Sequence, residues 1–425
     1  MIRNILTNFS ARIAVAAMNF FMLLLTTHEL RSGIRGEISI IQLSINLIHL
    51  ISDIAGGPAI VYLVPRSKLF PLYVTGTLWA AFSSFGVGFL LIHYGLLPST
   101  YSWPVLIVGF LFSLHSINQN ILLGQERIKA YNVLLLCQGL LQFIGMAGSI
   151  FIFEVHSAES YLQACYVAYG FCFITGLIIV SRRKHLPHLS DSRPLFAIIF
   201  ANGFFTQAAS LTHQLSIREN YFQLNKMKHL GNEAVGIYST ALSLGEAILL
   251  FSASVAAVLM SRISNSEDLQ QTRLKTISMS KFSLFVTVPA IAFFILLPPE
   301  FYSWLLGKDF RPVRDVFITI APGIALVSFG TVYSHYFSGS GKHYMNFFSG
   351  IVGLSVAMIS AKMLIESSGT NGAGWSASLA YGSMSLFIFI LFLFSRKGGN
   401  GEWKHLLPRK EDFQFLKALR TNQDQ

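Results

Sequence analysis

The sequence has few charged residues. Asp, Glu, Lys and Arg make up 12% of the 425 residues, whereas hydrophobic residues make up 53%. A soluble domain usually carries about twice that share of charge, because charged side chains have to cover its surface. The composition therefore excludes a water-soluble globular protein. It also leaves no polar segment long enough to fold as a separate catalytic domain.

Motifs for metal, nucleotide or covalent chemistry are missing as well. The three cysteines all lie in apolar stretches, which predicts neither disulfides nor a metal site. The segment 339–342 (GSGK) resembles the end of a phosphate-binding loop, but Tyr336 and His343 stand where that loop needs Gly and Ser or Thr. No Gly-x-Ser-x-Gly or Asp-x-Asp motif occurs. We therefore expect no enzyme activity, no catalytic residues and no cofactor.

Apolar stretches long enough to cross a membrane recur along the whole chain. A bilayer core about 30 Å thick takes roughly 20 apolar residues per helix. The stretches are continuous and lack the polar alternation of barrel strands. We therefore predict an all-α integral membrane protein with twelve transmembrane helices. The expected spans are 9–28, 37–64, 70–94, 103–123, 132–153, 159–181, 195–218, 235–260, 282–299, 315–337, 344–365 and 372–395.

The distribution of Lys and Arg predicts the orientation of these spans. With a cytoplasmic N-terminus, twenty-two of the 31 basic residues fall on the cytoplasmic side, eight fall outside, and Lys362 lies within a span. Cytoplasmic loops carry the excess of Lys and Arg, so both termini are expected there. The net charge of +11 is mostly this orientation signal. We expect the basic tail to contact membrane lipid, and we expect no nucleic-acid partner.

Two six-helix halves are expected from this arrangement. The predicted parts are an N-terminal lobe at 1–181, a basic cytoplasmic linker at 182–194, a C-terminal lobe at 195–395 and a basic cytoplasmic tail at 396–425. A faint repeat supports the division, because residues 33–39 (GIRGEIS) open the second span and residues 233–239 (EAVGIYS) open the eighth. Transporters with parallel halves bind their substrate between the halves.

Polar residues inside the spans are the best functional signal, because such groups are costly in hydrocarbon. The second span carries Ser39, Gln42, Asn46, His49 and Asp53 at steps of 3, 4, 3 and 4, which places all five on one helical face. A packing face joined by interhelical hydrogen bonds is the alternative. Five polar residues in one register, ending in a carboxylate, favour a water-filled cavity.

Asp53 and Glu246 lie in the second span of each half, which suits a role in coupling to protons or cations. The alternative for each is a carboxylate paired with a neighbouring basic residue. The Gly56-Gly57-Pro58 segment, Pro289 and Pro322-Gly323 are candidate bending points. Other spans carry shorter polar stripes, which are Arg12, Asn19 and Thr26; His115 and Gln119; Asn202, Thr206 and His213; Ser239, Ser243 and Glu246; and Ser328, Thr331 and His335.

Several segments together resemble the polysaccharide-biosynthesis flippases, which transport O-antigen and exopolysaccharide precursors. These flippases belong to the multidrug/oligosaccharidyl-lipid/polysaccharide (MOP) superfamily. The resemblance runs from about residue 30 to about residue 345, and its segments follow the order of the family. They are Gly36-Glu37 through Gly56, Leu123 to Arg127, Gly231 to Ser239, Ser261 to Ser264, Leu306 to Phe310 and Ser338 to Lys342.

The resemblance implies a two-lobed bundle similar to multidrug and toxin extruders (MATE transporters). Its expected activity is to move undecaprenyl-diphosphate-linked oligosaccharide across the bacterial cytoplasmic (inner) membrane. Cations should meet the diphosphate and polar groups should meet the sugar hydroxyls. The implied diphosphate contacts are Arg12, Arg31, Arg35 and Arg218, and the implied sugar contacts are Asn46, His49, Asn202 and His213. A proton or sodium counter-ion and a polysaccharide polymerase are the further partners.

Two alternatives remain open from the sequence. One is a cation-coupled multidrug and toxin extruder of the same superfamily. The other is a membrane enzyme, such as an oligosaccharide polymerase or acyltransferase. Polymerases usually need a large outer loop, and all the outer loops expected here are short. The sequence therefore favours the flippase.

Overall fold

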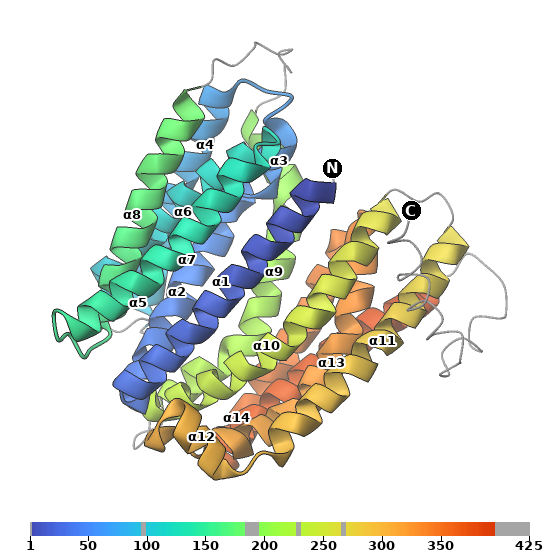
Figure 1. Cartoon of the computed structure of the whole chain (residues 1–425). Helices are drawn as coiled ribbons and strands as arrows, with labels where there is room; N and C mark the ends of the chain where they lie inside the picture. Colours follow the sequence, from blue (N-terminus) through green and yellow to red (C-terminus); the bar gives the residue numbers. More distant parts are fainter. Residues whose placement is uncertain (1, 95–98, 183–194, 227–230, 265–268, 396–425) are drawn as a thin grey trace. The chain divides into compact units, whose positions relative to one another are not determined.

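The structure is a computed structural model that describes residues 2–94, 99–182, 195–226, 231–264 and 269–395. These residues form helices and no β-strand (Figure 1). Helices satisfy their own backbone hydrogen bonds, as hydrocarbon requires. Nine helices in the described part are long and apolar enough to cross a membrane, which confirms the prediction of a multi-pass all-α protein. The count of twelve spans and the cytoplasmic termini stay predictions.

Two compact units make up the chain. Unit 1 holds residues Met1–Leu211, Leu224–Ser239 and Tyr302–Arg311, and unit 2 holds Thr212–Gln223, Thr240–Phe301 and Pro312–Gln425. Two short segments of the second half of the sequence therefore belong to unit 1. The predicted linker at 182–194 and tail at 396–425 lie almost wholly outside the described residues, so that division of the chain stays a prediction.

The helices of unit 1 include α1 (Ile2–Glu29), α2 (Ser32–Gly56), α3 (Pro58–Leu63), α4 (Leu69–Phe82), η1 (Ser83–Val87), α5 (Gly88–His93), η2 (Ser99–Tyr101), α6 (Ser102–Gly124), α7 (Ile128–Phe151) and α8 (Glu159–Ser181). Unit 2 includes α11 (Leu269–Leu296), α13 (Val313–Gly339) and α14 (His343–Phe394). The units share α9 (Leu195–Asn225), α10 (Gly231–Ser264) and α12 (Pro299–Leu306), and η3 (Lys308–Phe310) lies in unit 1.

Helix α2 has an apolar face and a polar face. Ile38, Ile41 and Ile48 are fully buried in a core shared with α6 and α8. The stripe predicted from the sequence lies on a different face, where Gln42 is exposed and Asn46, His49 and Asp53 are half-buried. A helix in lipid gains nothing from exposing such groups to hydrocarbon. His49 and Asp53 of this stripe contact α6, and the role of the stripe in lining a water-filled cavity stays a prediction.

The predicted helix break after Asp53 is confirmed. Gly57 has non-helical backbone angles (φ −99°, ψ −129°) and ends α2, and Pro58 opens α3. Proline suits the first position of a helix, because its missing N–H has no partner there. Pro289 and Pro322, in contrast, lie inside α11 and α13 without ending either helix.

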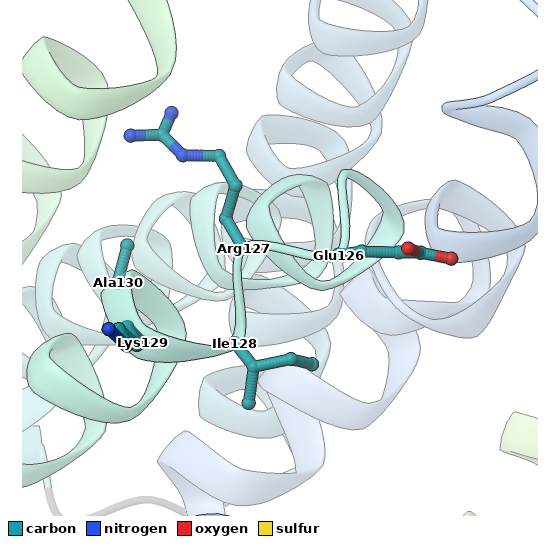
Figure 2. A pocket seen from close by; sticks show the side chains of 5 residues that line it. All are labelled: Glu126, Arg127, Ile128, Lys129 and Ala130. Carbon is teal, nitrogen blue, oxygen red and sulfur yellow. The ribbon is translucent and has the colours of Figure 1, made fainter. Parts of the chain in front are cut away.

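The turn between α6 and α7 has a structural role. Glu126 adopts a left-handed conformation (φ 57°), and Arg127 donates a hydrogen bond of 2.9 Å to the carbonyl of Ile179 near the end of α8. A Cβ at Gly124 would lie 2.9 Å from the carbonyl oxygen of Val61, so only glycine allows α6 to end this close to α3. Residues 126–130 line a small pocket from which the Glu126 and Arg127 side chains point apart (Figure 2).

A loop from the second half of the sequence closes the start of α2. Arg31 stands at the N-cap of α2 but makes no side-chain capping bond. Asp309 supplies one instead, because its carboxylate accepts a hydrogen bond of 3.4 Å from the backbone N–H of Ser32. The same loop contacts the end of α1, where the ring of His28 lies 2.9 Å from the Leu305 carbonyl. Carboxylates stabilise helix N-termini, so this loop anchors α2.

The two copies of the sequence repeat pack against each other within unit 1. A Cβ at Gly36 would overlap the Asn232 carbonyl oxygen, and a Cβ at Gly236 would overlap the Ser32 carbonyl oxygen. Ser39 donates a hydrogen bond of 2.8 Å to the hydroxyl of Ser239, one turn further along. The contact is reciprocal, because each repeat presents its glycine to the other's backbone. Small residues allow helices in membranes to approach this closely.

The helices after α10 differ from the prediction at two points and agree with it at a third. Helix α11 begins at Leu269, well before the predicted start at 282. The short helix α12 was not predicted. Helix α14 covers the predicted spans 344–365 and 372–395, and Gly369 between them has a non-helical conformation (φ 56°, ψ −129°). Positive φ is open to glycine at little cost, so Gly369 separates two helices.

We predict that Gly36→Ala destabilises the protein, because the added methyl group overlaps the Asn232 backbone. Overpacking of this kind costs about 1–3 kcal/mol. The control is Gly170→Ala, since a Cβ at Gly170 meets nothing within 4 Å. Thermal unfolding of the detergent-purified protein measures both variants. Equal melting temperatures for the two variants would show that the α2–α10 contact is not tight in solution.

Candidate functional site

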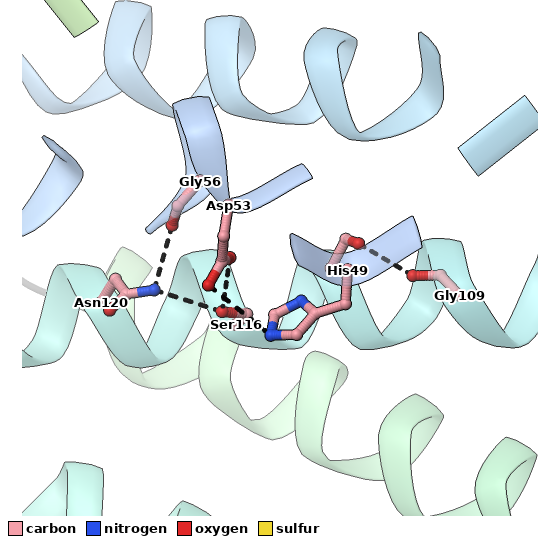
Figure 3. Close-up of polar contacts among 7 residues, drawn as sticks. His49, Asp53, Gly56, Gly109, Ser116 and Asn120 are labelled. Atoms are coloured by element: carbon pink, nitrogen blue, oxygen red, sulfur yellow. Dashed lines mark hydrogen bonds and ion pairs between the residues drawn. The ribbon is translucent and has the colours of Figure 1, made fainter. Parts of the chain in front are cut away.

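A polar cluster lies where α2 is interrupted, inside unit 1. The Asp53 carboxylate accepts a hydrogen bond of 3.1 Å from the hydroxyl of Ser116 on α6 (Figure 3). Its other oxygen lies 3.6 Å from Nε2 of His49, one turn earlier on α2. The His49 ring stacks on Phe112, with ring centroids 3.9 Å apart. Packing therefore holds the imidazole next to the carboxylate.

Asn120 connects this cluster to the break in α2. Its amide nitrogen donates to the Gly56 carbonyl at 3.0 Å and to the Ser116 hydroxyl at 3.2 Å (Figure 3). The carbonyls at a helix end have no intrahelical partner, so Asn120 satisfies a group that the break leaves free. A Cβ at Gly57 would lie 3.0 Å from the amide nitrogen of Gln207, so α9 also reaches the break.

Two polar residues of α6 that were not singled out from the sequence lie beside Asp53. His115 and Gln119 do not face Asp53; the His115 ring lies 3.1 Å from the side-chain oxygen of Gln138 on α7. Ser116 and Asn120, one position further along, form the cluster. Both pairs are spaced four residues apart, so periodicity alone cannot choose between them. The rotation of α6 against α2 decides, and it depends on packing.

A second polar cluster lies in unit 2. Nη2 of Arg218 on α9 lies 2.9 Å from Oε1 of Glu246 on α10, an ion pair between two residues that the sequence analysis selected separately. Nη1 of Arg218 donates to the side-chain oxygen of Gln214. Charged groups inside a membrane protein are found paired, because an isolated charge is costly there. Glu246 thus follows the alternative of a carboxylate neutralised by a basic residue.

Two tyrosines and a histidine surround this ion pair. Tyr221 hydrogen-bonds to the Arg218 side chain, and Tyr381 on α14 and His213 on α9 lie close enough to interact electrostatically with it. Helix α9 is held against α14 here by a hydrogen bond of 3.0 Å from Asn220 to the Ala373 carbonyl. Gln214, Tyr221 and Tyr381 were not predicted from the sequence. An i, i+4 spacing of Gln214 and Arg218 was the only available signal.

The other predicted site residues are spread over unit 1. Asn46 is half-buried on the same face as His49 and Asp53, and Arg31 is exposed before α2. Arg35 is buried and lies near Tyr161 of α8, one turn before Ser39 of the polar stripe. Arg12 and Asn202 lie on α1 and α9, and their side chains are outside the described part of the structure.

The two clusters suit different chemistry. The first offers a carboxylate, an imidazole and a hydroxyl, which can hold and pass a proton. The second offers a guanidinium, which is suited to carboxylates and phosphates. Among the described residues, no group of three or more His, Cys, Asp or Glu could hold a metal ion.

We predict that Asn120→Ala lowers the stability of the protein, because it leaves the Gly56 carbonyl without its donor. A buried carbonyl without a partner costs about 1–3 kcal/mol. Gln119→Ala is the matched control, since Gln119 is the neighbouring amide and its nitrogen has no partner among the described residues. Thermal unfolding in detergent is the measurement. A larger loss for Gln119→Ala would contradict the assigned role of Asn120.

Comparisons with solved structures show the fold. A structure of the lipid II flippase MurJ in an inward closed conformation is similar with a TM-score of 0.70 and 15% identity, covering 99% of this chain and 96% of that chain. An inward-facing multidrug resistance MATE family transporter of the MOP superfamily has a TM-score of 0.68 and 14% identity, covering 92% and 97%. Its outward-facing counterpart has a TM-score of 0.63 and 15% identity, covering 92% and 94%.

The family comparison is more specific than the fold. No curated protein matches this chain. The family model described as "Polysaccharide biosynthesis protein" matches residues 77–315, which is more than half of the chain. The match begins within α4 and ends within α13, so it includes α6 with its cluster residues and the Arg218–Glu246 pair. The chain is a multi-pass membrane protein with a MATE- and MurJ-like fold, and it belongs to the polysaccharide biosynthesis protein family.

Proposed function

We propose that the protein is a flippase for lipid-linked oligosaccharide. It moves undecaprenyl-diphosphate-linked repeat units across the bacterial cytoplasmic membrane by alternating access, for the synthesis of O-antigen, capsule or exopolysaccharide. One combined observation carries the proposal. A polysaccharide biosynthesis protein has a transporter-like membrane fold, and polar and ionisable side chains lie within its membrane helices.

The cargo has two parts that polar groups can recognise. Its diphosphate suits Arg218, because a guanidinium forms paired hydrogen bonds with phosphate oxygens. Its sugars suit the half-buried face of α2, where Asn46 and His49 present an amide and an imidazole. Arg12, Arg31, Asn202 and His213 remain proposed contacts. Arg35 is a weaker contact than the sequence predicted, because it is buried beside Tyr161.

Coupling is assigned to the two membrane carboxylates. Asp53 lies beside His49 and the helix break at Gly57, so a change in its charge acts on the point where α2 bends. Glu246 neutralises Arg218. A proton or a sodium ion is the proposed counter-ion. Both residues lie where a charge without a partner would be costly.

A multidrug extruder is the second candidate. It is favoured by the similarity to MATE transporters, which nearly equals the similarity to MurJ. An extruder changes the resistance of cells to organic cations and stops when the ion gradient collapses. A flippase changes the surface polysaccharide.

Deletion of the gene separates these candidates. We expect diphosphate-linked repeat units to accumulate on the inner leaflet, and surface polysaccharide to disappear and then return with the intact gene. The strain should contain no second flippase of this kind. Unchanged surface polysaccharide together with altered drug resistance would favour the extruder.

We predict that Asp53→Asn reaches the membrane in normal amounts and loses most transport. An amide stays neutral and cannot alternate between a protonated and a charged form as the carboxyl group does. The surface polysaccharide restored in the deletion strain measures transport, and immunoblotting of membranes measures the amount of protein. Asp315→Asn is the control, since Asp315 is an exposed carboxylate at the start of α13. Normal polysaccharide with Asp53→Asn would remove Asp53 from the mechanism.

A further inference from the structure

We infer that Glu246 and the phosphate of the cargo compete for Arg218, and that a proton on Glu246 frees the guanidinium to bind phosphate. The inference rests on the proposed flippase function and deepens it. It assigns a site for the diphosphate and states how that site is switched. Its starting point is the ion pair in unit 2.

The guanidinium is already occupied in the structure. Nη2 lies 2.9 Å from the Glu246 carboxylate, Nη1 donates to Gln214, and Tyr221 hydrogen-bonds to the side chain. Carboxylates and phosphates use the same fork of N–H groups on arginine. A phosphate can therefore bind in full only where the carboxylate has withdrawn, so the two anions exclude each other at Arg218.

The replacement of Glu246 by phosphate at Arg218 is favourable only when Glu246 takes up a proton. An ionised Glu246 without Arg218 would be an unpaired charge among membrane helices, which is costly. A protonated Glu246 is neutral, and it can leave the guanidinium without that penalty. The phosphate then supplies the negative charge that Arg218 needs. One proton is thus taken up for each diphosphate bound.

The exposed fractions of the two side chains agree with Glu246 being the partner that leaves. The Glu246 side chain is 39% exposed and the Arg218 side chain is 16% exposed, so the carboxylate is the more accessible partner. The backbone of α10 next to Glu246 packs closely against α13, because a Cβ at Gly245 would overlap the side chain of Ile324. The side chain of Glu246, rather than its helix, has to move away from Arg218.

Other ionisable groups near the pair are few in the described residues. They are His213 and Tyr221 on α9 and Tyr381 on α14. The tyrosines keep their protons near neutral pH. Histidine is the side chain whose ordinary pKa lies nearest to neutral pH, and protonation of His213 would also favour phosphate binding. A test of the inference therefore needs a His213 variant.

Binding of undecaprenyl diphosphate to the full chain in lipid nanodiscs, measured between pH 5.5 and 8, tests the inference. We expect wild-type affinity to fall with rising pH, by up to about tenfold per unit for one linked proton. Glu246→Gln should bind tightly across the range and lose this steep dependence, because it mimics the protonated acid. Arg218→Gln should bind weakly throughout. Glu219→Gln is the control, since Glu219 is bonded to Gln223 instead, and it should resemble wild type.

Proton uptake gives a second measurement that needs no variant. Adding undecaprenyl diphosphate to the wild-type protein in weakly buffered solution at pH 8 should raise the pH, by about one proton per ligand bound. The diphosphate is already ionised there and contributes no uptake of its own. Binding without uptake would overturn the inference even if Glu246→Gln failed to fold.

The outcomes separate the inference from the proposed function. Equal pH dependence in wild type and Glu246→Gln would overturn the inference and leave the flippase intact. Loss of the dependence in His213→Gln, with Glu246→Gln unchanged from wild type, would assign the switch to His213 and also overturn it. Absence of binding at every pH, together with normal surface polysaccharide in the deletion strain, would overturn both.

Discussion

The lack of water in the hydrocarbon core is the constraint on which the rest of this structure depends. Every backbone polar group within a span has to find its partner in the protein, and an unpaired polar side chain there is costly. Backbone groups do so by forming helices, and the Gly56 carbonyl at the break in α2 accepts a hydrogen bond from Asn120. Side chains follow the same rule, since Asp53 meets Ser116 and Arg218 meets Glu246. The pairs that stabilise the fold are thus also the groups to which the proposed function assigns protons and phosphate.

Close approach between helices is the other requirement, and the repeated segments show how it is met. Each repeat places a glycine against the backbone of the other, and the serines that follow share a hydrogen bond. The equivalent residues are Gly36 and Gly236, and Ser39 and Ser239. Because each repeat contributes the same glycine and the same serine, the repeat in the sequence corresponds to a symmetric contact in the structure. The loop carrying Asp309 then holds the start of α2 from the side.

Much of the fold was predictable from the sequence, because hydropathy is a property of single segments. The membrane spans, the break at Gly57 and the polar face of α2 follow from composition and periodicity. The choice between His115 and Ser116 does not, since it depends on how α6 is rotated against α2. The pairing of Arg218 with Glu246 was missed for the same reason, as these residues lie on different helices. The start of α11 was missed because its first turns are polar.

The assignment of residues 224–239 and 302–311 to unit 1 has a consequence for how the chain is built. Both segments come from the second half of the sequence, yet they belong to unit 1. A fragment that stops after the first six predicted helices would lack the partner of Gly36 and the cap of α2. The packing of the first half therefore depends on segments of the second half, whereas unit 2 is built from the second half alone.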